Sequence, residues 1–408
     1  AVYKTALTDA SLRSLTYPSA VATTFDLNFN TIADDFTFTR GSEATFVNAQ
    51  GLIQSTASND APRLDYSTGA EAFLLEPQST NLVPYSQSYT SGWIFDNSTI
   101  TENSTISPDG NINAGLWKGN TVSSRHNIGV TPTPAGSVTA SFSLFVKAKE
   151  LKYLQIASAN TVNQYVNFDV ESGIIGTVGS NFSNAKIENY SNGWYRISVV
   201  SPNQYNGYYI SLVSGLTATW LESWVMPNNT DGLYIWGAQV EAQSYPTSYI
   251  PTSGASATRN QELCNNATPV INSEEGTLYA EISALANDGT NRYVAISDGS
   301  NNERVQIILS SVTNNIVMSV VSSNSGQAQF TATVSQTQYN KLAISYKAND
   351  VSFWLNGIKV HTDTNANMPI GLNVLEFQRP NNTSPFFGNT KGLKYYPKAL
   401  ADVQLQDL

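Results

Sequence analysis

The stretch Tyr234–Gly254 reads Tyr-Ile-Trp-Gly-Ala-Gln-Val-Glu-Ala-Gln-Ser-Tyr-Pro-Thr-Ser-Tyr-Ile-Pro-Thr-Ser-Gly. The residues from Leu233 to Val240 are rich in aromatic and β-branched side chains, which predicts a short strand. Pro246 and Pro251 follow, and proline cannot donate a backbone hydrogen bond to a strand ladder. The stretch therefore predicts the closing strand of a β-domain and its exit.

Strand patterns continue upstream of this stretch. In the segment around Phe142, Leu144 and Val146, large apolar residues alternate with polar or smaller ones, as in a half-buried strand. Residues 86–255 are therefore predicted to form a jelly-roll β-sandwich, which by fold-level analogy resembles carbohydrate-binding modules. Its predicted strands are Val138–Ala148, Tyr153–Ser158, Gln164–Asp169, Trp194–Val200, Tyr208–Val213 and Leu233–Val240.

The N-terminal 85 residues are predicted to form two smaller regions. Residues 36–85 contain turn signals at short intervals and are expected to form β-hairpins that attach the subunit. Residues 1–35 form an N-terminal anchor segment in this interpretation, with a short helix over Thr5–Leu15 and a strand over Thr23–Asn30. The alternative for this leader is a strand that packs on the first domain.

A second sandwich is predicted after a polar connector at residues 256–272. Two alternating strands flank Asn349-Asp350, and Asn356-Gly357 is a tight-turn signal. A strand and a short helix are expected to close the chain over Gly392–Leu405. Residues 273–408 are therefore expected to form a concanavalin A-like (laminin-G-like) sandwich, and the fold class is all-β with tandem β-sandwiches.

Several motifs occur in the order typical of one family. They are Phe38-Thr-Arg-Gly-Ser-Glu-Ala-Thr-Phe46, Ala61-Pro-Arg-Leu-Asp-Tyr66, Leu74-Leu-Glu-Pro-Gln-Ser-Thr-Asn-Leu-Val-Pro-Tyr85, Gly193-Trp-Tyr-Arg196 and the stretch quoted first, all within roughly residues 36–260. In these motifs the chain resembles the head-spike or tail-fibre family of tailed bacteriophages. The resemblance implies a virion fibre, spike or decoration subunit that presents β-domains to a host surface, commonly as a homotrimer.

Composition limits the partners. Charged residues make up only 13% of the 408 residues, well below the roughly 25% of an average soluble domain, so uncharged Asn, Ser and Thr must supply solubility. The net charge of −10 argues against nucleic-acid binding and against an anionic membrane surface. Cys264 is the single cysteine, which fits assembly in a reducing host cytoplasm and release by lysis to the exterior of the phage particle.

Catalytic motifs are scarce. The two histidines, His126 and His361, lie in different predicted domains, which argues against a zinc site. Glycoside hydrolysis needs a pair of carboxylates, and the nearest candidates are Asp169, Glu171 and Glu281. We expect these acids to be solvated turn or strand residues, so a non-enzyme is predicted, with a polysaccharide depolymerase as one alternative.

Aromatic residues are the candidates for sugar binding, because their faces stack on the C–H groups of sugars. Trp220 and Trp224 are expected to share one strand face, and Trp93 and Trp117 lie near predicted loops. The alternative is that Trp220 and Trp224 fill the sandwich core. Trp194, Trp236 and Trp354 fall inside strand patterns and are predicted to lie in the core.

One loop offers oxygen ligands of the kind that Ca²⁺ prefers. Asp298, Asn301 and Glu303 lie in Asp298-Gly-Ser-Asn-Asn-Glu303. Hairpin turns use the same residue types for backbone reasons, so a plain turn is the alternative.

The sequence thus predicts a structural virion protein that adheres to host-surface glycans. Its N-terminal region is expected to bind other virion proteins, with no membrane insertion. A decoration protein without a host ligand is the further alternative. Exposed aromatic clusters would favour adhesion, whereas a surface of Asn, Ser and Thr alone would favour decoration.

Overall fold

The structure is a computed structural model that describes residues 23–132, 138–159, 161–202 and 207–408. It is almost entirely β and divides into two compact units. The central unit is Phe38–Leu263, and the terminal unit combines the residues before Phe38 with Cys264–Leu408. The predicted all-β fold with tandem sandwiches is confirmed. Within the described ranges, no helix is long and apolar enough to cross a membrane.

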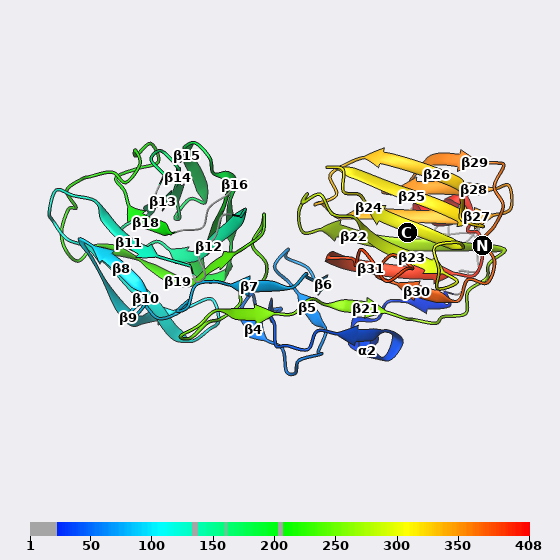
Figure 1. The fold of residues 1–408 in the computed structure, drawn as a ribbon, viewed down its shortest axis with the longest axis horizontal. Coiled ribbons are helices and arrows are strands. Elements are labelled where there is room, and N and C mark those ends of the chain that lie inside the picture. Colours follow the sequence, from blue (N-terminus) through cyan, green and yellow to red (C-terminus); the bar gives the residue numbers. More distant parts are fainter. Residues whose placement is uncertain (1–22, 133–137, 160, 203–206) are drawn as a thin grey trace, which may run out of the picture. The chain divides into compact units, whose positions relative to one another are not determined.

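The central unit contains a sandwich of two six-stranded sheets in which all pairings between neighbouring strands are antiparallel (Figure 1). The first sheet has the order β16 (Ser183–Asn189), β17 (Trp194–Ser201), β12 (Ala140–Lys147), β19 (Gly232–Glu241), β10 (Ile112–Gly119) and β9 (Ser98–Ile106). The second sheet has the order β15 (Ile174–Val178), β14 (Tyr165–Asp169), β13 (Tyr153–Ser158), β18 (Tyr208–Leu212), β11 (His126–Val130) and β8 (Trp93–Asp96).

The core of this sandwich follows from the alternation in the sequence. Phe142, Leu144 and Val146 of β12 pack with Leu154 and Ile210 of the facing sheet in one apolar cluster. Burying large apolar side chains in this way stabilises each by roughly 1.5–3 kcal/mol. The predicted strands match β12, β13, β14, β17, β18 and β19 to within two residues at each end.

A second apolar cluster lies on the other face of the first sheet. Phe145, Trp194 and Trp236 pack there with Tyr249 and with Val47 of a small hairpin. Strands β12 and β19 are therefore buried on both faces, which is why their sequences are so apolar. The remaining short elements of this unit are β3 (Thr45–Val47), β4 (Ile53–Ser55), β5 (Arg63–Asp65), β6 (Ala72–Leu75), β7 (Ser79–Asn81), η2 (Ser191–Gly193) and β20 (Ala257–Arg259).

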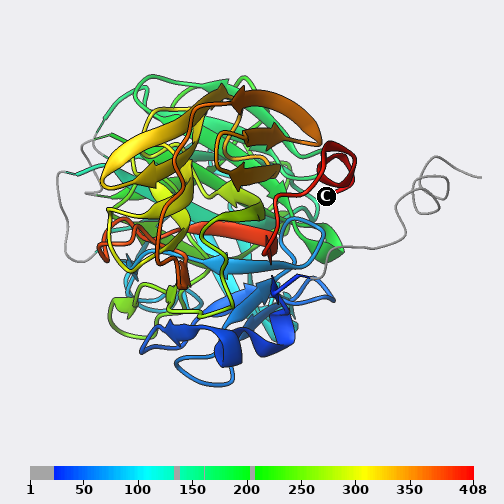
Figure 2. The same cartoon turned by 90° about the vertical axis from the view of Figure 1, so that its right-hand side faces the viewer.

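The terminal unit is a second sandwich of antiparallel sheets. Its helix α3 lies beside strand β29 (Figure 2). One sheet has the order β29 (Ile358–Asp363), β28 (Val351–Leu355), β27 (Asn340–Lys347), β22 (Glu275–Ala284) and β31 (Gly388–Tyr396), and β1 (Phe25–Asp26) pairs with β31. The other sheet has the order β26 (Ser325–Thr333), β25 (Asn315–Ser322), β24 (Arg304–Leu309), β23 (Arg292–Ser297) and β30 (Val374–Glu376). The helical pieces are η1 (Phe29–Thr31), α2 (Ile32–Asp35) and α3 (Asp402–Gln406), and the strands β2 (Thr37–Thr39) and β21 (Leu263–Asn265) lie where the two units meet along the chain.

The turn signals of the terminal unit are confirmed. Asn356 and Gly357 have φ angles of 51° and 77°, as the two-residue turn between β28 and β29 requires. The closing strand and helix are also present, as β31 and α3. The predicted strand over Thr23–Asn30 is wrong for most of its length, because only Phe25–Asp26 pairs with β31 and helical turns begin at Phe29. The predicted helix over Thr5–Leu15 lies outside the described residues.

Candidate functional site

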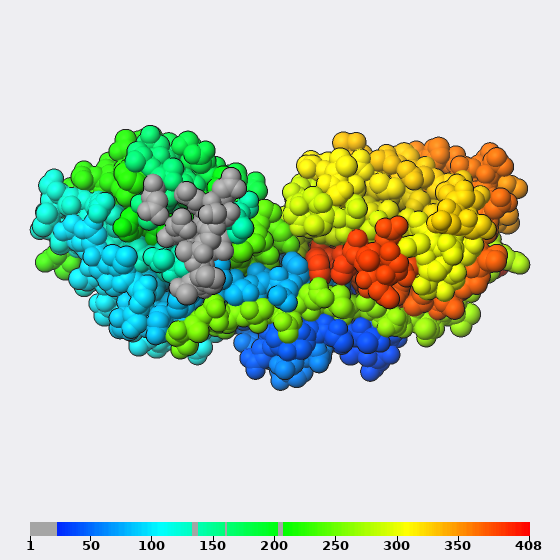
Figure 3. Space-filling view, in the orientation of Figure 1, coloured from blue at the N-terminus to red at the C-terminus, as the bar shows by residue number. Residues whose placement is uncertain are grey.

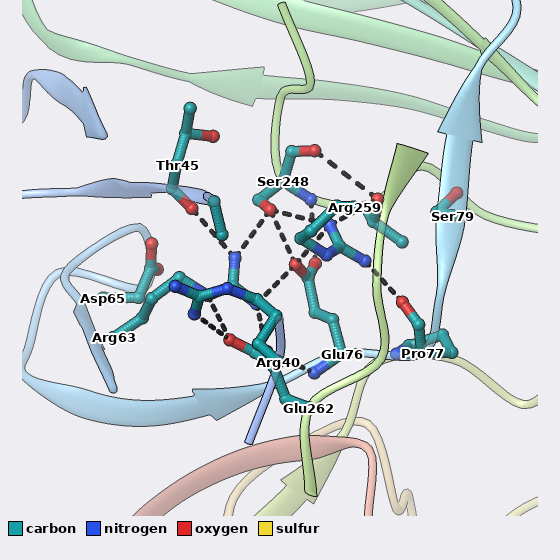
Figure 4. Close-up of polar contacts among 12 residues, drawn as sticks. Arg40, Thr45, Arg63, Asp65, Glu76, Pro77, Ser79, Ser248, Arg259 and Glu262 are labelled. Carbon is teal, nitrogen blue, oxygen red and sulfur yellow. Dashed lines mark hydrogen bonds and ion pairs between the residues drawn. The ribbon is translucent and has the colours of Figure 1, made fainter. Parts of the chain in front are cut away.

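Three motif residues, Arg40, Arg63 and Glu76, meet two residues of the predicted connector, Arg259 and Glu262, in one buried group of charges (Figure 4). We call this group the Arg–Glu network. The Glu262 carboxylate binds Arg40 Nη1 at 2.8 Å and Arg63 Nε at 2.8 Å. The Glu76 carboxylate binds Arg63 Nη2 and Arg259 Nη1, each at 2.8 Å. None of these charged side chains is more than 4% exposed.

Further polar groups close the network on all sides. Ser248 Oγ donates to Glu76 Oε2 at 2.6 Å, and the Glu76 backbone N–H donates to Glu262 Oε2 at 2.8 Å. The segment 251–263 forms a yellow-green band on the surface (Figure 3), but Arg259 and Glu262 within it are buried. Water and ligands thus have no access to these charges, and the network serves to hold the fold.

Electrostatics explains why the charges remain ionised when buried. Burial opposes ionisation of Glu76, but Arg259 and Arg63 together with the Ser248 hydrogen bonds outweigh it, and the pKa of Glu76 is lowered to about 2. In Arg63, burial likewise opposes the charge, yet Glu262 and Glu76 raise its pKa above the ordinary value. Each charge is therefore stable only while its partners are present.

Other motif residues also have structural contacts. The Asn81 side chain donates to the carbonyls of Ala238 and Ile250, and its Oδ1 accepts from Val83 N and Val240 N. Glu241, fully buried, accepts from Ser79, Gln239 and Thr247. The motifs therefore encode how the hairpin region is joined to β19.

The tryptophans proposed for sugar binding are mostly in the core. Trp117 is fully buried in β10, and Trp93 is buried in β8 with its indole N–H donating to Tyr85 O at 3.0 Å. Both predictions are wrong, because neither residue lies in a loop and neither face is free to stack. The core prediction for Trp194, Trp236 and Trp354 is confirmed, since each is at most 2% exposed.

Trp220 and Trp224 are half-buried, but they do not share a strand face. Apart from an isolated bridge between Ser124 and Trp224, their segment is a loop, so the expected strand spacing does not apply. Trp224 donates to Leu212 O at 3.0 Å, and its ring meets His126 edge-on at 6.1 Å. Trp224 thus packs against the sandwich core rather than presenting a face to ligands.

The predicted calcium loop is held by protein groups. Glu303 is buried and accepts from the backbone N–H groups of Ser323 and Ile370 at 2.7 and 3.0 Å. Asp298 accepts from Ser300 N, and Asn301 Oδ1 accepts from Arg379. In the described part of the chain, no three acidic, histidine or cysteine side chains are grouped as a metal site requires. The three residues are used as turn and loop contacts.

The acids of the hydrolase alternative also have structural partners. Asp169 accepts from the backbone N–H groups of Glu171 and Ser172, so it caps a turn. Glu171 pairs with Lys152 at 2.7 Å and its side chain is 61% exposed. Glu281 lies in β22 of the other unit.

The outer face of the second sheet of the central unit presents aromatic side chains that sequence reasoning missed. Since Ile128 and Ile210 point into the core, Gly129 and Tyr209 point outward. One line of paired residues crosses this face, and we call it the tyrosine row: Ile94, Gly129, Tyr209, Ala157 and Tyr165. Tyr209 and Tyr165 are half-exposed and stand two strands apart, ~10 Å in backbone spacing.

Both tyrosines lie across glycines. A Cβ atom at Gly129 would meet Tyr209 Cε1 at 2.7 Å, and one at Gly179 would meet Tyr165 Cδ1 at 2.8 Å. The absence of these side chains lets each ring approach the backbone. Ala157 lies between the two tyrosines in the register and is itself fully buried.

Polar groups flank the tyrosine row. Arg125 lies over the Tyr209 ring at 5.9 Å and pairs with Asp96 at 2.5 Å. Asn127 is on the same face and buried, and neither atom of its amide has a hydrogen-bonding partner among the described residues. A buried amide without a partner costs about 1–3 kcal/mol, but at 1% exposure Asn127 is out of reach of a ligand on this face. In the sequence, the tyrosine row could have been located from two patterns, the alternation Asn127-Ile-Gly-Val130 and the pair Tyr208-Tyr209.

Comparisons with known proteins give limited support. No protein-family model matches the chain, and no curated protein matches it. Among solved structures, it is similar to domain 4 of AbnA, a GH43 extracellular arabinanase from Geobacillus stearothermophilus in complex with arabinotriose, with 17% identity, 40% of this chain and 82% of that chain covered, and a TM-score of 0.31.

Two other solved structures are similar over more of the chain. A putative carbohydrate binding protein from Bacteroides ovatus has 11% identity, 80% and 83% coverage of this chain and that one, and a TM-score of 0.26. Domains LG4-5 of the mouse laminin α1 chain have 8% identity, 79% and 96% coverage, and a TM-score of 0.23. The neighbours are thus carbohydrate-binding and laminin-G-like β-sandwich proteins. All TM-scores are below 0.5, so function must be argued from the residues of this chain.

Proposed function

We propose that this chain is a non-enzymatic structural protein of a tailed-phage virion, a fibre, spike or decoration subunit that binds a host-surface glycan through the tyrosine row. The observation that carries the glycan part is the pair of half-exposed tyrosines lying against glycines on one sheet face. The motif resemblance supports the virion part of the proposal.

The chemistry of the face fits a sugar chain. Aromatic rings stack on the C–H faces of sugars, while a few fixed polar groups orient the hydroxyls. Tyr209 and Tyr165 supply the rings, and Arg125 with Asp96 supplies partly exposed polar groups beside Tyr209. Two sugar residues of one chain would each stack on a tyrosine.

Binding at a single copy would be weak, because the surface has only two rings. Repeated copies on one particle raise the effective concentration of the second and later contacts and so increase avidity. A homotrimer anchored to other virion proteins through its N-terminal region would supply such copies.

A glycan array and a whole-cell binding assay with the full chain test the proposal, with release of reducing sugar followed in the same wells. We expect saturable binding without sugar release. The affinity of Tyr209→Ala should be about tenfold lower, since the stacking of one aromatic ring on a sugar is worth ~1 kcal/mol or more. The matched control is Tyr339→Ala, which removes a half-exposed tyrosine of the other unit.

Each other outcome favours a specific alternative. Sugar release would favour a depolymerase and direct attention to Asp169, Glu171 and Glu281. Absence of binding by the wild-type chain would favour a decoration protein without a host ligand. Equal binding by Tyr209→Ala and the wild type would contradict the tyrosine row as the site.

A further inference from the structure

A hollow of about 350 Å³ lies in the central unit at the edge of the sandwich, beside strands β8 and β9. These are the edge strands of the two sheets and are joined through Asn97, which has a φ of 50°. Ser98, Ile100 and Glu102 line the hollow from alternate positions of β9. The rest of the lining is Phe95 of β8 with Tyr89, Thr90 and Thr99. The hollow is close to the lower limit of small-molecule sites, ~300 Å³, which suits a ligand of one sugar residue.

The apolar part of the lining includes an unusual side chain. Phe95 is 39% exposed, and it is the one aromatic side chain classed as exposed among the described residues. Tyr89, in contrast, is buried with its ring against Trp93 at 5.0 Å and against the backbone of Gly115. An open phenyl ring beside a hollow costs free energy in water and gains it when a ligand with C–H groups covers it.

The polar part of the lining has unused hydrogen-bonding capacity. Glu102 Oε1 accepts from Ser88 Oγ at 2.9 Å and from Tyr89 N at 2.6 Å, which fixes the carboxylate in place. The hydroxyl oxygens of Tyr89 and Ser98 are buried, and neither has a partner among the described residues. Fixed polar groups with free capacity are what a hydroxyl-rich ligand requires.

The charge of the lining restricts the ligand class. Glu102 is the charged residue that lines the hollow, and no lysine, arginine or histidine lines it within the described part of the chain. A carboxylate accepts hydrogen bonds from sugar hydroxyls but repels a second carboxylate. The site therefore favours a neutral sugar over an acidic one.

We infer that this hollow binds a single neutral sugar residue at the end of a glycan, with Phe95 stacking on the ring and Glu102 accepting hydrogen bonds from its hydroxyls. The inference rests on the proposed glycan-binding function and adds a second subsite to it. Ile94, the end of the tyrosine row, adjoins Phe95 in β8, and successive residues of a strand point to opposite faces. To reach both sites, one glycan would have to bend around β8, the edge strand of its sheet.

Saturation-transfer NMR on the full chain tests the site, with methyl glycosides of neutral hexoses and of a uronic acid as probes. We expect neutral glycosides to bind and the uronic acid to bind more weakly. Phe95→Ala and Glu102→Gln should each weaken binding of the neutral probe about tenfold, whereas Thr101→Ala, which changes an outward-facing residue of the same strand, should not. Thermal melting of each variant checks that the fold is retained.

The same variants on the glycan array separate this inference from the proposed function. One outcome is that Tyr209→Ala loses glycan binding while Phe95→Ala and Glu102→Gln bind both the array glycan and the neutral probe like the wild type. This would overturn the inference that the hollow binds a sugar and leave the proposed function standing. Wild-type chain that binds neither probe nor array glycan overturns both. Preference for the uronic acid over the neutral hexoses also overturns the inference.

Discussion

The Arg–Glu network and the tyrosine row lie in the same unit but are built in opposite ways. The network gathers charged side chains from three separate motifs and from the predicted connector at residues 256–272, and it excludes water from all of them. The tyrosine row uses uncharged side chains of neighbouring strands and leaves two rings half-exposed. The comparison teaches that the densest motifs of this chain record how it folds, whereas its candidate ligand surface carries a much weaker pattern.

The largest effect is expected from breaking the network. Glu262→Gln leaves Arg40 and Arg63 buried with too little negative charge, and removing one member of a buried ion pair costs about 3–5 kcal/mol. We expect the free energy of unfolding, measured with urea, to fall by that amount. Glu171→Gln is the matched control, since it breaks an exposed pair and should cause no measurable change. A loss below about 1 kcal/mol for Glu262→Gln would show that the network contributes little.

Acid should weaken the network in a defined range. The pKa of Glu76 is about 2 in the folded chain against an ordinary value of 4.5, so its ionised form stabilises the fold by about 3 kcal/mol above pH 4.5. Because the folded pKa is the lower one, this stabilisation should be lost as the pH falls from about 4.5 towards 2. Unfolding free energies measured across this range check the prediction.

A variant isolates this contribution from those of other carboxylates. In Glu76→Gln, the free energy of unfolding at neutral pH should be lower and its decrease between pH 4.5 and 2 should be smaller by the part that Glu76 supplies. The same steepness in variant and wild type would mean that other groups cause the acid sensitivity.

Much of the fold could be predicted from the sequence because period-two alternation and turn residues act locally. The alternation of Phe142, Leu144 and Val146 and the turn at Asn356-Gly357 each depend on a few neighbouring residues. The partners of Arg63 could not be predicted, since Glu262 lies 199 residues away in the chain. The tyrosine row could not be predicted either, because it depends on the register of five strands, and abundant tryptophan drew attention to residues that the core buries.

The smallest effect on stability, and the sharpest test of the row, is expected from Gly129→Ala. The added Cβ would meet Tyr209 Cε1 at 2.7 Å, and the half-exposed ring can move away into solvent rather than distort the sheet. We expect glycan binding to fall severalfold while the free energy of unfolding changes by about 1 kcal/mol or less. Tyr209 is still present in this variant, so a loss of binding would show that the placement of the ring against Gly129 matters and not its hydrophobicity alone. Unchanged binding in the array would mean that Gly129 serves packing only. The Arg–Glu network and the tyrosine row would then differ in exposure but not in function.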